Sequence, residues 1–130
     1  MSSTTGPVEP LLVDEVQREL RRCLDRVAAL GPGRLVRPGP RPVGAEAVDD
    51  EGVQAGAPVD LLRPLLQQLA DAGADLEGEP RRVVPVLGAH ALGHQLAVLA
   101  RDVLAAAQVR DDAAALATLH NRLVALRRTL

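Results

Sequence analysis

Leucine and valine recur at alternating spacings of three and four residues, and this spacing constrains the fold more than any other feature. A stripe of this kind lies on one face of an α-helix. Leu12 and Leu24 widen the first stripe, and charged residues such as Glu19 occupy the other faces. A helix is therefore predicted over residues 10–30, ending at Gly31-Pro32-Gly33, where proline cannot continue the helical hydrogen bonds. The first stripe consists of Val13, Val16, Leu20, Cys23, Val27 and Leu30.

Three more helices are predicted, over residues 60–74, 86–108 and 111–130. Asp60 is the expected cap of the first of them, since Pro64 is tolerated only in a first turn. Pro85 places the start of the next between residues 85 and 89, and Asp111 and Asp112 supply the cap of the last. Their apolar stripes are Leu62, Leu65, Leu66, Leu69 and Leu76; Pro85, Ala89, Leu92, Leu96, Leu99, Val103 and Ala106; and Leu116, Leu119, Leu123, Leu126 and Leu130.

These elements predict an all-α fold, an up-down bundle of about four helices with a long irregular crossover between the first and second helices. The bundle forms a single domain over residues 1–130, with a flexible N-terminus at 1–9 and a Pro/Gly-rich crossover loop at 31–57. Short connections after the second and third helices favour antiparallel neighbours. A three-helix core with the second helix at its edge is the alternative.

The crossover at 31–57 has two interpretations. Its arginines, Arg34, Arg37 and Arg41, precede its acidic residues, Glu46 and 49–51. One interpretation is a flexible polar connection. The other is an arm that binds a protein partner, with residues 34–38 extended or polyproline-like.

Composition excludes several classes of function. The chain has no Phe, Tyr, Trp or Lys, so every cation is an arginine, and its formal net charge is −2. This bias is that of GC-rich coding sequence, as in a high-GC bacterium. Without a basic field or aromatic stacking platforms, nucleic-acid binding is not expected. The lone Cys23, the absence of a long apolar run and the lack of a signal-like N-terminus predict a cytoplasmic protein that does not enter a membrane.

Two histidines, His90 and His94, are the sharpest candidates for a chemical site. At a spacing of four they stack on one helix face and can share a metal ion, although His120, the remaining histidine, is expected too far along the last helix to join them. Both are expected to point to solvent. Cys23 falls in an apolar stripe, where it packs as a small hydrophobe and not as a nucleophile. The carboxylate clusters at 49–51 and 111–112 lack the apolar setting that acid–base catalysis needs.

The sequence therefore favours a non-enzymatic protein-protein interaction or oligomeric adaptor module that needs no cofactor. Because Leu and Val bury less area than aromatic side chains, pairing two chains along an apolar face would add stability, and a homodimer is expected. Residues 31–57 are the expected contact with another protein. The alternative function is metal binding or metal-dependent catalysis by His90 and His94.

Overall fold

The chain forms an all-α bundle of four helices, as predicted. The computed structural model describes residues 9–37 and 56–130, which contain no strand. The helices are α1 (Pro10–Leu35), α2 (Val59–Glu77), α3 (Leu92–Val109) and α4 (Ala113–Thr129), and a 3₁₀ turn, η1 (Ala89–Ala91), leads into α3. The predicted flexible segment at 1–9, except Glu9, and the part of the predicted crossover at 38–55 lie outside the described residues.

Helix α1 has the predicted break but continues beyond it. Gly31 has φ +76° and ψ 163°, a conformation that only glycine adopts easily, and it separates the long predicted helix from a short helical piece that ends at Leu35. Pro32 opens this piece, where its missing N–H costs nothing. Leu35 is only 1% exposed. The interpretation of residues 34–38 as an extended arm is therefore wrong for Arg34 and Leu35. Both residues are helical, and the Leu35 side chain packs in the core of the bundle.

Two helix boundaries differ from those predicted. Helix α2 continues to Glu77 and ends where Gly78 takes the left-handed conformation, with φ +70°. Pro58, not Asp60, is its N-cap, and the Asp60 carboxylate accepts a hydrogen bond from the Ala57 N–H at 3.2 Å. Helix α3 starts six residues later than predicted because Gly88 is extended, with φ −64° and ψ 162°. The cap of α4 is as predicted, since Asp112 accepts from the Ala115 N–H at 3.0 Å.

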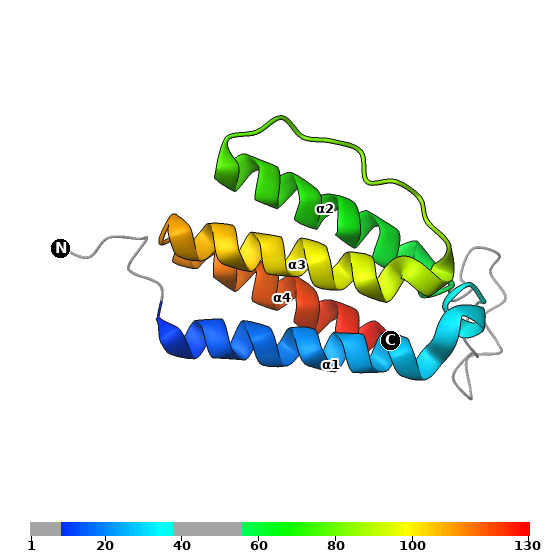
Figure 1. The fold of residues 1–130 in the computed structure, drawn as a ribbon. Helices are drawn as coiled ribbons and strands as arrows, with labels where there is room; N and C mark the ends of the chain where they lie inside the picture. Colours follow the sequence, from blue (N-terminus) through cyan, green and yellow to red (C-terminus); the bar gives the residue numbers. More distant parts are fainter. Residues whose placement is uncertain (1–8, 38–55) are drawn as a thin grey trace, which may run out of the picture.

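Helices α1, α3 and α4 contact one another, and α2 packs mainly on α3 (Figure 1). Every predicted stripe contributes to one core, which is aliphatic apart from Cys23. The prediction that α2 and α3 are antiparallel is wrong: both run in the same direction (Figure 1). Near the ends of the two helices, a Cβ on Gly73 would lie 3.8 Å from Val103, as expected for a parallel pair. The largest fully buried side chains are Val16, Cys23, Leu35, Leu62, Leu66, Leu69, Leu92, Leu96, Val103, Leu116, Leu119 and Leu123.

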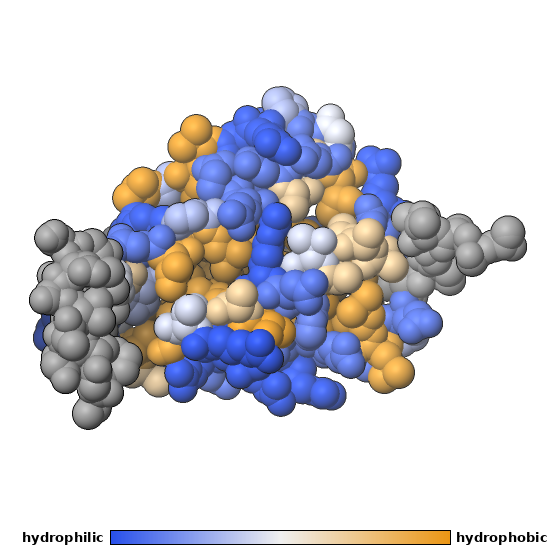
Figure 2. Space-filling view, turned by 180° about the vertical axis from the view of Figure 1, so that it is seen from behind, coloured by the Kyte–Doolittle hydropathy of each residue, from blue (hydrophilic) through white to orange (hydrophobic). Residues whose placement is uncertain are grey.

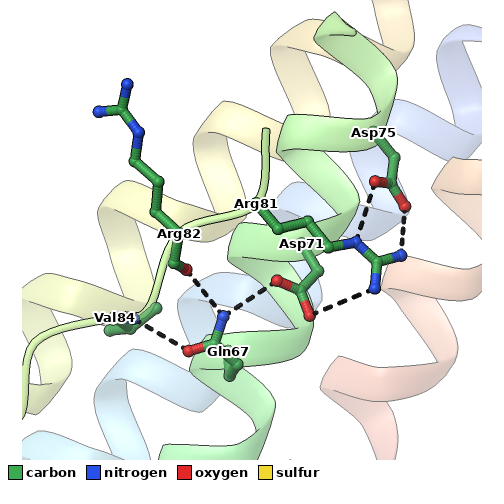
Figure 3. Close-up of polar contacts among 6 residues, drawn as sticks. All are labelled: Gln67, Asp71, Asp75, Arg81, Arg82 and Val84. Atoms are coloured by element: carbon green, nitrogen blue, oxygen red, sulfur yellow. Dashed lines mark hydrogen bonds and ion pairs between the residues drawn. The ribbon is translucent and has the colours of Figure 1, made fainter. Parts of the chain in front are cut away.

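A parallel pair needs a connection that runs back along the helices, and residues 79–88, here called the strap, provide it (Figure 1). Gln67 holds the strap by its side-chain amide, which donates to the Arg82 carbonyl and accepts from the Val84 N–H, both at 2.9 Å (Figure 3). Arg81 pairs with Asp75 at 2.7 Å and lies 4.0 Å from Asp71. The strap is thus fixed to α2 by polar contacts spaced one helical turn apart.

Candidate binding surfaces

The two candidate metal ligands lie on the surface, as the sequence predicts. His90 is in the turn η1 and His94 is in the first turn of α3, and both side chains are exposed. His120 is half-buried on α4. Across residues 9–37 and 56–130, no three His, Cys, Asp or Glu side chains gather closely enough to hold a metal ion. The described part of the chain therefore offers the histidine pair no further ligand.

Cys23 is fully buried, as predicted, and its thiol donates a hydrogen bond to the Leu123 carbonyl at 3.1 Å. Burial, reinforced by the nearby Glu19 carboxylate, raises the pKa of the thiol to about 12. Arg127 acts in the opposite direction but does not cancel burial. At neutral pH the sulfur is protonated and shielded, so it cannot serve as a nucleophile in the folded chain.

Glu19 is buried, contrary to the prediction from the sequence. It was expected among the outward-facing charges, but it is only 4% exposed. Its carboxylate accepts a hydrogen bond from Arg127 of α4 and lies 3.7 Å from Arg22. A buried carboxylate is tolerated only when it is paired, and this pair joins α1 to α4. Because this ion pair connects two helices beside the buried Cys23 thiol, the role of Glu19 is structural.

The remaining charged candidates do not form a common site. Asp112 is occupied as the cap of α4, and Asp111 beside it has φ +56°. Arg34 and Arg37 are exposed at the end of α1. Arg41 and the acidic cluster at 49–51 lie outside the described residues.

An open groove, which the apolar stripes do not predict, runs between α1 and α3. It consists of two adjoining hollows of about 350 and 290 Å³ that share Leu24. Small residues line the second hollow, where a Cβ on Gly93 would lie 3.5 Å from Val27, in ordinary van der Waals contact. The available signal was a run of small residues four apart on α3 and the turn before it, Ala89, Gly93 and Ala97. We call this surface the α1–α3 groove. It is lined by Gln17, Leu20, Arg21, Leu24, Val27, Ala28, Gly31, Pro32, Leu35, Ala89, His90, Gly93, Arg101 and Leu104.

The charge at the α1–α3 groove is positive on both sides. Arg21 of α1 and Arg101 of α3 line the same hollow, and both are exposed. Neither guanidinium forms an ion pair or a hydrogen bond with another described residue. Asp25 lies one helical turn from Arg21 but is not paired with it. His90 lines the other hollow, beside an apolar floor.

A second groove, between α2 and α4, is more apolar. We call this surface of about 240 Å³ the α2–α4 groove; it is lined by Leu61, Leu65, Gln68, Arg122, Ala125, Leu126 and Thr129. Leu61 is 47% exposed there. The Thr129 hydroxyl donates to carbonyls of its own helix, including that of Ala125 at 2.9 Å, and so offers little to a ligand. Figure 2, seen from the α4 side, shows apolar side chains open to solvent among polar ones.

Comparison with known proteins adds no relative. No family model matches the chain, and neither the curated proteins nor the solved structures include a significant match. None of the helices in the described ranges combines the length and apolar character needed to cross a bilayer. The described residues form a small all-helical bundle whose open hollows include these two interhelical grooves, which share no residue.

Proposed function

We propose that this chain is a small non-enzymatic protein-protein interaction module that acts as an oligomeric adaptor. The observation that carries the proposal is the pair of open grooves with apolar floors, built by different helix pairs. Open apolar surface of this kind marks contact sites on soluble proteins. The state of Cys23, whose pKa is raised to about 12, supports a binding role over a catalytic one.

The first partner is a second copy of the chain, bound through the α2–α4 groove. Leu61 and its apolar neighbours would be covered in a two-fold dimer, in which the same surface is used on both chains. The aliphatic core supports this proposal, because a core without aromatic side chains leaves a narrow margin of stability that dimer formation would widen. Arg122 is the single charged residue that lines the groove, so little charge has to be desolvated.

The oligomeric state tests this proposal directly. Light scattering after size-exclusion chromatography at 5 to 200 μM protein, a range chosen on the order of micromolar dissociation constants, should show a dimer. Leu61→Glu should yield a folded monomer, since half of this side chain is already exposed. Leu11→Glu is the matched control, because Leu11 is 71% exposed on α1 and lies outside both grooves. A wild-type chain that stays monomeric at the highest concentration would refute the dimer.

The alternative, metal binding by His90 and His94, has its own test. Elemental analysis of untagged protein should show no stoichiometric zinc, nickel or iron, because two exposed imidazoles make a weak site. Stoichiometric metal that is lost in His94→Ala would replace the interaction role with a metal-dependent one. A cytoplasmic location is part of the same proposal, supported by the single reduced cysteine.

A further inference from the structure

The α1–α3 groove has two features that together specify what it binds. Its floor is apolar, with Leu20 and Leu104 almost fully buried beneath it and Leu24 half-buried where the hollows meet. Its rims carry Arg21 and Arg101 on two different helices, with no described carboxylate paired to either. A ligand for this surface must be apolar along one side and negatively charged beside it.

The walls of the groove specify the conformation of the ligand. Both walls are α-helices, and their backbone N–H and C=O groups are already bonded within each helix. A β-strand laid in the groove would find no backbone partners, whereas a helix satisfies its own backbone. From Gln17 to Gly31 the groove extends along α1 for about 21 Å at 1.5 Å per residue. This is the length of about four helical turns.

Charge separates the partner from two other classes of ligand. A second copy of this chain would bring its own Arg21 and Arg101 against the first pair, and like charges across an interface oppose association. Nucleic acid would meet a floor of leucine and valine with no aromatic side chain for stacking. In a chain of net charge −2, two unpaired arginines facing one groove favour an acidic partner.

We infer that the α1–α3 groove binds an amphipathic α-helix of a partner protein, with acidic residues over Arg21 and Arg101 and apolar residues over Leu24, Val27 and Gly93. This inference rests on the proposed interaction role but not on the dimer. With the α2–α4 groove holding a second copy, each dimer presents two such helix-binding grooves. That arrangement makes the chain an adaptor that displays two copies of the same helical segment.

The experiment uses fluorescein-labelled helical peptides of about 14 residues, the length that fills the groove. The acidic peptide carries leucines at i, i+3, i+4, i+7 and i+11 and glutamates near one end. In the neutral peptide glutamine replaces glutamate, and in the basic peptide lysine does. The full chain is compared with the double variant Arg21→Glu/Arg101→Glu. The control, Arg18→Glu/Arg110→Glu, changes the net charge equally at exposed arginines outside the groove.

Fluorescence anisotropy should rank the acidic peptide first, the neutral one second and the basic one last. Reversing Arg21 and Arg101 should weaken binding of the acidic peptide by about ten-fold, since two attractive rim contacts become repulsive, while the control should change it less than about two-fold. Equal affinity for all three peptides, or equal loss in both double variants, would overturn the inference. So would tighter binding of a labelled DNA duplex than of the acidic peptide.

The fold and the dimer are checked on the same samples. Far-UV circular dichroism should be unchanged in both double variants, because neither pair of side chains forms an ion pair or a hydrogen bond with another described residue. Size-exclusion light scattering reports the dimer independently. A monomer that binds the acidic peptide disproves the dimer and keeps this inference, whereas a dimer that ignores all peptides disproves only the inference.

Discussion

The buried thiol makes the stability of this protein depend on alkaline pH in a way that can be isolated. Cys23 has its pKa raised from 9.0 to about 12 in the folded state, chiefly by burial. Above pH 9 the unfolded chain releases the thiol proton, while the folded chain keeps it until about pH 12. A raised folded-state pKa of this kind gives stability that is complete below pH 9 and is lost as pH rises toward 12. Between pH 9 and 11 the loss is about 2 kcal/mol.

The composition makes this measurement clean. Lysine and tyrosine, which also titrate near pH 10, are both absent from the chain, and arginine stays protonated. The free energy of unfolding is measured by urea unfolding at pH 9, 10 and 11 with a reductant present. Circular dichroism is the probe, because the chain has no aromatic side chain for fluorescence. Cys23→Ala should be less stable at pH 9 but nearly independent of pH. A Cys23→Ala variant that loses as much stability as the wild type would refute the reasoning.

Three further variants test the packing. Arg127→Met should lower the free energy of unfolding by about 2–3 kcal/mol, because Glu19 stays buried with a weaker partner. Adding Glu19→Leu should recover most of the lost stability, and chemical denaturation of the single and double variants measures both effects. Arg81→Gln should return the lowered pKa of Asp75 to its ordinary range, as carbon-detected NMR titration of the carboxyl would show. Gly78→Ala should cost about 1 kcal/mol in thermal unfolding, since its φ is +70°.

The existence and inward faces of the helices could be predicted because they are local properties. The predicted stripe of α4 is buried at four of its five positions, and Leu130 packs at the edge of the core. The capping role of Asp112 likewise depends on residues within one turn. Glu19 could not be placed in this way, because its partner Arg127 is 108 residues away. A carboxylate one position from the apolar stripe, such as that of Glu19, is buried only where the facing helix provides a charged partner.

The exposure of the histidine pair could be predicted from the local sequence, whereas the α1–α3 groove could not. His90 and His94 are both exposed, as predicted, but only His94 lies in α3, because the helix begins at Leu92 and His90 falls in the turn η1. The groove depends on which residues of α1 and α3 face each other across the bundle. Only the packing of the two helices shows that Val27 is a neighbour of Gly93 and that Arg21 and Arg101 line the same hollow.

The parallel orientation of α2 and α3 is the largest departure from the prediction, and the connection between them is just long enough to allow it. Helix α2 has 19 residues and is about 28 Å long, and a return over this distance needs a nearly extended connection. The ten residues of the strap span about 33–36 Å when fully extended, which is just enough. Pro80, Pro85 and the β-branched Val83 and Val84 favour the extended backbone that this span requires. A connection of this length and composition therefore permits either orientation, and Gln67, by binding the backbone on either side of Val83, stabilises the parallel one.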